Sequence, residues 1–205
     1  MASPRNHIKV FVASTVYNFQ TELNKIYELL DGFGYDVLNS HKGTFLIDST
    51  ESNLQNCIER VSECDVFVGF IRPDYGSGVL ERGGKSITHI EFETAVARKI
   101  PRFVMADHRV TFTRSLIRKA TLDIPSLGVH FNVDSSNINF NDNKIMDIRC
   151  VQLYEEMVKD KIPPLKRKGN WVQEYVNLED IRLHLDSQFK YPERIKSLMD
   201  KISKL

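Results

Sequence analysis

Residues 65–71 read Asp-Val-Phe-Val-Gly-Phe-Ile, a nearly unbroken apolar run. A short run rich in β-branched and aromatic residues is typical of a strand that is buried on both faces of a parallel sheet. A second run of this kind, HIKVFVA, occupies residues 7–13. These two segments predict the centre of a parallel sheet.

Helices and strands alternate on either side of these segments. Four apolar residues recur at helical spacing after the first strand: Phe19, Leu23, Ile26 and Leu30. The other elements expected before residue 121 are a strand at 35–39, a helix at 52–63, a glycine-rich loop at 72–85, a helix at 86–99, a strand at 101–106 and a helix at 112–120. We therefore expect a flavodoxin-like α/β fold with helices on both faces and about five parallel strands in the order 2-1-3-4-5.

The regular alternation of strands and helices ends after residue 120. Residues 121–143, rich in Asn, Asp and Ser, predict a loop with a short strand near residues 138–140. The elements expected after it are a helix at 144–161, a polar break at 163–169, a strand at 171–176, a helix capped by Asn177 and a basic amphipathic helix at 192–205. We expect an α/β domain at residues 1–125, and a segment at 126–205 that completes the sheet and adds a helical extension. The apolar stripe of the last helix would pack on the body, or form an oligomer contact, with packing favoured.

Composition excludes several functional classes. With 28 basic and 27 acidic residues the net charge is +1, which gives no electrostatic reason to expect a nucleic acid or an anionic membrane as partner. No apolar run approaches the length of a membrane span, and residues 1–9 do not have the pattern of a signal peptide. The three cysteines and six histidines show no metal-ligand spacing. We expect a cytoplasmic protein with reduced thiols and no metal.

Ligands of open parallel sheets bind beyond the carboxyl ends of the strands. The turn at residues 14–17, the loop that contains His41 and the loop at 72–78 would meet there, beside the start of the helix at residue 86. Their hydroxyls, glycines and aromatic rings suit a ribose-bearing or phosphorylated ligand. The candidate substrate-binding residues are Ser14, Thr15, Tyr17, Arg72, Tyr75, Gly76, Ser77, Ser86 and Thr88, and the candidate catalytic residue is Glu91.

Glu91 has two interpretations on the sequence alone. Thr88 and Glu91 have the T-x-x-E spacing of a capping box, so the carboxylate would merely satisfy a backbone amide. Alternatively, a carboxylate in a ligand cleft is a functional group. Three common catalytic or phosphate-binding motifs do not fit: Val79 stands where a phosphate loop ending in Gly84-Lys85-Ser86 needs glycine, and neither G-x-G-x-x-G nor G-x-S-x-G follows the first strand.

Several short motifs occur together in an order that resembles a known family. They are KVFVAST at 9–15, QTE at 20–22, GYDV at 34–37, ECDVF at 63–67, YGSG at 75–78, Ser86-Ile87-Thr88 with Glu91, and WVQEY at 171–175. As a set they resemble a TIR-like domain family of bacterial proteins and of NACHT-containing animal proteins. The resemblance covers roughly the first half of the chain and part of the C-terminal segment.

The resemblance implies a catalytic role for Glu91. The family is similar in fold to TIR domains and to nucleoside 2-deoxyribosyltransferases, whose Thr-x-x-Glu-x-x-x-Ala pattern corresponds here to Thr88, Glu91 and Ala95. The glutamate attacks C1′ of the sugar in the transferases, and it contacts the ribose of NAD in catalytic TIR domains. The transferases carry an acidic residue where this chain has Ser86-Ile87, which weighs against nucleobase exchange more than against NAD cleavage.

The first hypothesis is therefore a TIR-like NAD nucleosidase or ADP-ribosyl cyclase. NAD would be its substrate, with no cofactor, and the product would be a nucleotide signal read by a downstream effector protein. The resemblance implies a homo-oligomer and bacterial anti-phage defence of the Thoeris kind. One carboxylate could suffice, because nicotinamide leaves as a neutral molecule from a cationic substrate. The alternatives are a non-catalytic interaction or ligand-sensing module, and a nucleoside or nucleotide glycosyl transferase.

Overall fold

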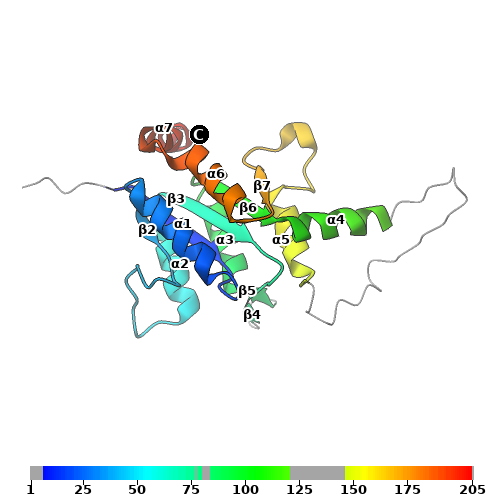
Figure 1. The fold of residues 1–205 in the computed structure, drawn as a ribbon, viewed down its shortest axis with the longest axis horizontal. Helices are drawn as coiled ribbons and strands as arrows, with labels where there is room; N and C mark the ends of the chain where they lie inside the picture. Colours follow the sequence, from blue (N-terminus) through cyan, green and yellow to red (C-terminus); the bar gives the residue numbers. More distant parts are fainter. Residues whose placement is uncertain (1–6, 77, 80–83, 121–145, 205) are drawn as a thin grey trace, which may run out of the picture.

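The computed structural model describes residues 7–76, 78–79, 84–120 and 146–204. It has the predicted α/β architecture, a five-stranded parallel sheet between two layers of helices (Figure 1). The strands of the sheet are β1 (Lys9–Ser14), β2 (Asp36–Leu38), β3 (Val66–Ile71), β6 (Arg102–Asp107) and β7 (Val172–Tyr175).

The strand order β2-β1-β3-β6-β7 confirms the predicted order 2-1-3-4-5, because these are the sheet strands in chain order. β1 and β3 are neighbours at the centre, and their parallel register runs from Val10 opposite Val66 to Ser14 opposite Phe70. The two strands therefore end side by side, which brings the segments that follow Ser14 and Ile71 to the same edge of the sheet.

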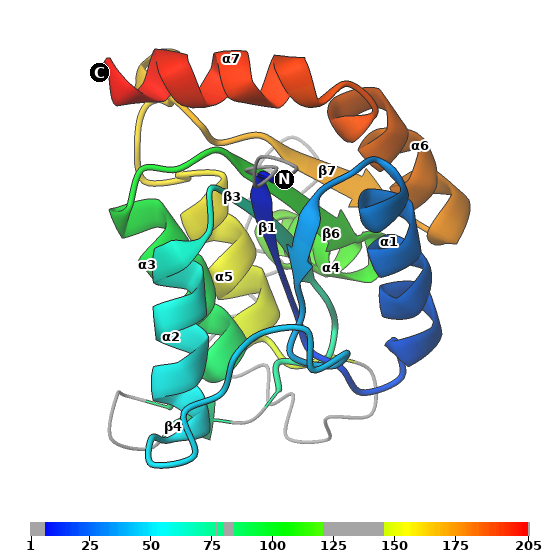
Figure 2. The ribbon, with the colours of Figure 1, turned by 90° about the vertical axis from the view of Figure 1, so that its left-hand side faces the viewer.

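Two groups of helices cover the sheet, one on each face (Figure 2). The helices are α1 (Gln20–Gly32), α2 (Asn53–Glu63), α3 (Ile87–Ala97), α4 (His108–Ala120), α5 (Arg149–Met157), α6 (Leu178–Phe189) and α7 (Pro192–Ser203), with a 3-10 turn η4 (Pro164–Lys166). Residues of α1, α6 and α7 share one apolar cluster with the sheet, and residues of α2, α3, α4 and α5 share the other. No helix in the described part of the chain has the length and apolar character that a membrane span requires.

The two-residue period of a strand explains this division of the core. In β1, Val10 and Val12 belong to the cluster under α1 and α6, whereas Phe11 and Ala13 belong to the cluster under α2 and α3. β3 is buried along its whole length, as its apolar run predicts. Gly69 lets α3 approach closely, since a Cβ at this position would lie 2.4 Å from the Phe92 ring.

The structure differs from the predicted elements in three places. The loop at 72–85 contains a short antiparallel hairpin of β4 (Gly78–Val79) and β5 (Lys85–Ser86), whose two-residue strands are too short to leave a pattern in the sequence. α4 forms, but two of the apolar residues that predicted it are exposed, Phe112 at 67% and Leu116 at 56%. The residue of α4 that is buried in the core is Val110. α5 is shorter than the expected helix at 144–161, since Lys159 takes a positive φ just beyond its end. The strand predicted near residues 138–140 lies outside the described residues.

The C-terminal segment joins the sheet as predicted. β7 pairs with β6, and the Asn177 side chain accepts hydrogen bonds from the backbone N–H groups of Glu179 and Asp180 in a capping box that begins α6. α7 packs on the body through Ile195, which is buried in the same cluster as β1. The stripe therefore packs on the body at Ile195 and partly at Met199, whereas Leu198 is exposed.

Candidate active site

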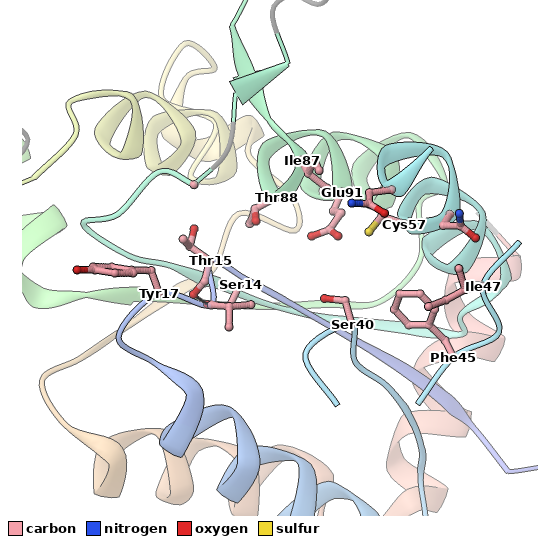
Figure 3. A pocket seen from close by; sticks show the side chains of 14 residues that line it. Ser14, Thr15, Tyr17, Ser40, Phe45, Ile47, Cys57, Ile87, Thr88 and Glu91 are labelled. Carbon is pink, nitrogen blue, oxygen red and sulfur yellow. Dashed lines mark hydrogen bonds between the residues drawn. The ribbon is translucent and has the colours of Figure 1, made fainter. Parts of the chain in front are cut away.

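A cavity of about 650 Å³ opens at the carboxyl ends of β1 and β3 (Figure 3). This volume lies within the range of about 300–1,000 Å³ typical of small-molecule sites. The residues that line it come from the β1–α1 turn, the loop after β2, α2, the loop after β3 and the start of α3: Ser14, Thr15, Val16, Tyr17, Ser40, Phe45, Ile47, Asn53, Asn56, Cys57, Gly76, Ile87, Thr88 and Glu91. The topology of the sheet explains the location, because ligands bind at this edge where strand order reverses.

Six of the candidate residues lie around this cavity. They are Ser14, Thr15, Tyr17, Gly76, Thr88 and Glu91. Gly76 has a φ of +85°, and a Cβ there would lie 3.2 Å from Thr15 Oγ1. A side chain at residue 76 would therefore both strain the backbone and press on the β1–α1 turn.

Arg72 does not line the cavity, contrary to its expected substrate contact. Its buried guanidinium donates hydrogen bonds to the carbonyl oxygens of Thr15 (3.1 Å), Tyr17 (2.5 Å) and Asn18 (3.3 Å). The guanidinium also lies 4.5 Å from the centre of the Phe19 ring. Arg72 therefore holds the β1–α1 turn in place, because its two terminal nitrogens donate to these three carbonyl oxygens and to the Asp74 carboxylate at 3.4 Å.

Tyr75 and Ser86 also lie outside the cavity lining. The buried Tyr75 hydroxyl lies 2.5 Å from His89 Nδ1, and the Ser86 hydroxyl accepts a hydrogen bond from the His89 backbone N–H. Both residues thus stabilise the first turn of α3 through His89. Ser77 lies outside the described residues.

Glu91 is not a helix cap. Ser86 is the N-cap of α3, so His89 rather than Glu91 occupies the third helical position and receives the capping contact. The capping-box interpretation of Thr88 and Glu91 is therefore wrong, since the helix begins two residues earlier than that spacing requires. Glu91 instead directs its carboxylate into the cavity, where only 4% of the residue is exposed (Figure 3).

The surroundings of Glu91 disfavour its negative charge. Burial raises the pKa of its carboxyl from the usual 4.5 to about 8, and only the hydrogen bond from the Cys57 thiol opposes this increase. Arginine and lysine do not occur among the described residues that line the cavity. The carboxylate therefore lacks a cationic partner in its own wall, which makes the site receptive to a positively charged group.

The α2 wall contributes residues that were not predicted. Asn56 and Cys57 line the cavity, as do Phe45 and Ile47 of the loop after β2, whereas His41 does not. The Asn56 amide already has partners within the fold. Its oxygen accepts a hydrogen bond from the Asp48 backbone N–H at 2.7 Å, and its nitrogen donates one to the Ser52 carbonyl oxygen at 3.1 Å. The apolar spacing of α2 indicates a helix, but it does not reveal which end of the helix reaches the ligand edge of the sheet.

A second polar cluster lies on the other side of α3. His89 Nε2 is 3.0 Å from Glu156, and ligand-type atoms of His89, Glu93 and Glu156 lie within 4.8 Å of one another. The Lys85 ammonium donates a hydrogen bond to Glu93 and so supplies a counter-charge within the cluster. The histidine spacing in the sequence does not reveal this grouping, because Glu156 comes from α5.

The sequence was compared with known families and proteins. Residues 9–190 match a protein family described as "Domain of unknown function (DUF4062)". A comparison with curated proteins finds no match. The matched segment contains all five strands of the sheet and every residue that lines the cavity. Because the match covers most of its length, this chain belongs to the family described as "Domain of unknown function (DUF4062)".

Proposed function

We propose that this protein is a TIR-like enzyme that cleaves NAD at the bond between nicotinamide and ribose. The observation that carries the proposal is Glu91, a buried carboxylate in the cavity wall without a cationic partner among the described lining residues. Breaking an N-glycosidic bond places positive charge on the sugar ring. A carboxylate held beside that ring in a desolvated site stabilises this charge strongly.

The choice of leaving group follows from the other titratable groups. Among the described lining residues these are Cys57 and Tyr17, and burial keeps the Cys57 thiol protonated with a pKa of about 12. A thiol that holds its proton so tightly is a poor general acid near neutral pH. Nicotinamide in NAD already carries a positive charge and leaves without receiving a proton. This favours NAD over a neutral nucleoside, whose base leaves more easily when it is protonated.

The remaining lining residues suit a nucleotide. Thr15 and Ser40 bring hydroxyl groups to the cavity that can hydrogen-bond the hydroxyls of a ribose, and the Ser14 hydroxyl, which donates to the Thr15 carbonyl oxygen at 3.0 Å, can still accept. Phe45 and Tyr17 offer aromatic rings on which a base could stack. The product would be ADP-ribose or a cyclised form, read as a signal by a downstream effector protein in anti-phage defence, and a homo-oligomer would be the active state.

The test is the substitution Glu91→Gln. Gln keeps the size of the side chain and removes its charge, so NAD cleavage should fall by about a thousandfold or more, equivalent to roughly 4 kcal/mol in the barrier. Turnover would be measured by separating nicotinamide and ADP-ribose products after incubation with purified protein, over a range of protein concentrations to allow assembly.

Glu93→Gln is the matched control. Glu93 lies two residues further along α3, is partly exposed and pairs with Lys85 outside the cavity. This variant should retain cleavage within a few fold of the wild type. Wild-type turnover by Glu91→Gln would remove Glu91 from catalysis. If NAD bound to the wild type and remained intact under all conditions, the ligand-sensing module would replace the enzyme as the better account.

A further inference from the structure

Cys57 is the neighbour of Glu91 across the α2–α3 interface. It lies on α2 and lines the same cavity, and its sulfur lies beside the Glu91 carboxylate (Figure 3). Contact with this thiol lowers the pKa of the Glu91 carboxyl, against the effect of burial. Among the described residues, Cys57 is the side chain that shifts the pKa of Glu91.

We propose that Cys57 is a positioning residue, whose S–H group donates a hydrogen bond to the Glu91 carboxylate and holds it toward the cavity. The importance of this contact for catalysis rests on the proposed function. A carboxylate without a fixed partner can rotate about its terminal bonds, and a reacting group must be held in one orientation to act efficiently.

The protonation of the two groups is consistent with this donor and acceptor assignment. Burial, and after it the charge and the hydrogen-bonding oxygens of the Glu91 carboxylate, together raise the pKa of Cys57 to about 12. The thiol therefore stays protonated across the physiological range and remains a donor. It also opposes the effect of burial on the pKa of Glu91, because a hydrogen bond to a carboxylate favours the charged form.

The other elements around Glu91 offer few competing groups. The β1–α1 turn presents the hydroxyls of Ser14 and Thr15 and the phenol of Tyr17, and the loop after β2 presents Ser40. None of these groups contributes to the pKa shift of Glu91, nor does any charged residue in the part of the chain that the structure describes. Burial has the largest effect on the ionisation of Glu91, and Cys57 is the side chain to which it should respond.

The other two cysteines use their thiols differently and supply controls. Cys64 is buried at the end of the same helix and donates to the Val61 carbonyl oxygen at 3.2 Å. Cys150 is buried in α5 and donates to the Pro73 carbonyl oxygen at 3.3 Å. Neither lines the cavity. Cys64→Ala thus removes a buried thiol from the residue that caps the C-terminus of α2, outside the cavity that Glu91 lines.

The first experiment measures the contact without reference to NAD. Reaction of Cys57 with methyl methanethiosulfonate would be followed by peptide mass spectrometry in the wild type and in Glu91→Gln, at pH 6.5 and pH 9. At pH 9 the wild-type carboxylate is charged and suppresses thiolate formation, so the variant should react about tenfold faster, corresponding to about one pKa unit. At pH 6.5 the two proteins should react at similar rates. Equal rates at both pH values would overturn the proposal.

The second experiment measures the consequence for turnover, as the pH profile of NAD cleavage. Removal of the donor in Cys57→Ala should move the rise in rate about one pH unit toward alkaline pH, with about tenfold lower turnover at pH 7. Cys57→Ser keeps a hydroxyl donor and should restore the wild-type profile within a few fold. Cys64→Ala should leave the profile unchanged, even where it lowers the melting temperature.

The two experiments separate the two proposals. An unshifted profile in Cys57→Ala, or a shift of the same size in Cys64→Ala, would reject the positioning role. If the wild type did not cleave NAD, the proposed function would fail, while the rates of disulfide formation with methyl methanethiosulfonate would still decide whether the Cys57 thiol holds Glu91.

Discussion

Glu91 illustrates how one buried side chain can reduce the stability of a protein. Its carboxyl has a pKa of about 8 in the folded protein, against an ordinary value of 4.5. Between these two values the folded state binds the proton more tightly than the unfolded state does. The free energy of unfolding therefore decreases as the pH rises from about 4.5 to 8. Such a cost is retained where a charged group serves a function.

This sign gives a prediction about stability that is independent of activity. Glu91→Gln has no titrating group, so it should become more stable relative to the wild type as pH increases. The relative gain between pH 5 and pH 9 should be on the order of 4 kcal/mol. Urea unfolding of both proteins at the two pH values measures it. An equal difference at both would show that Glu91 titrates normally in the folded protein.

At the scale of elements, the β1–α1 turn depends on a residue from another loop. α1 begins without a side-chain cap on its first amides, and Asn18 takes a positive φ of 52° just before it. Arg72, which follows β3, binds three carbonyl groups of this turn. Since the turn supplies Ser14, Thr15 and Tyr17 to the cavity, Arg72 determines part of its shape.

Arg72→Met should therefore affect both stability and substrate binding. Methionine keeps much of the apolar contact with Phe19 but leaves the carbonyls without their donor, at a cost of about 2 kcal/mol or more. KM for NAD should increase by more than kcat decreases, because Glu91 lies on a different element. Thermal melts and steady-state kinetics test this.

Arg182→Met is a suitable comparison. Arg182 is about half-exposed and pairs with Glu179 and Asp186 on the surface of α6, where ion pairs contribute little. Arg182→Met should leave KM for NAD unchanged. It should change the free energy of unfolding by no more than about 1 kcal/mol. Similar kinetics in the two variants would show that Arg72 does not shape the cavity.

At the scale of the whole molecule, the core extends across the expected division near residue 125. Tyr175, Ile181, Leu185, Phe189 and Ile195 belong to one buried cluster together with residues of β1 and β3. β7 also covers the edge of β6, which would otherwise present unpaired backbone groups. Segments 1–125 and 126–205 thus contribute to the same sheet and the same core.

We predict a single cooperative unfolding transition for the full chain. Trp171, the only tryptophan, lies next to β7 and reports on the C-terminal segment, whereas circular dichroism reports on all helices. The two signals should change at the same denaturant concentration. Protein that ends at residue 169 should not fold, because it lacks β7, α6 and α7. Two separate transitions would instead support a domain boundary near residue 125.

The sequence by itself determined the parts of this protein that local chemistry controls. The apolar runs at 7–13 and 65–71 predicted the central strands, and the β-α alternation predicted the strand order, because crossovers between parallel strands have a fixed hand. The same topology indicated the edge of the sheet where the cavity lies, and it drew attention to Glu91, Ser14 and Thr15, which line that cavity. These inferences need only periodicities and the connectivity of a parallel sheet.

Tertiary structure alone decided which side chains reach the cavity and what surrounds them. Arg72 and Tyr75 follow β3 as expected, yet their polar groups bind the backbone of the β1–α1 turn and His89, whereas Cys57 on a different helix reaches Glu91. The start of α3 at Ile87 likewise depends on Ser86 and excludes Glu91 from capping. The physical reason is that the direction of a side chain depends on packing between elements distant in sequence. Burial then determines the pKa of a carboxyl. Neither the direction of a side chain nor its burial can be read from the local spacing of residues in the sequence.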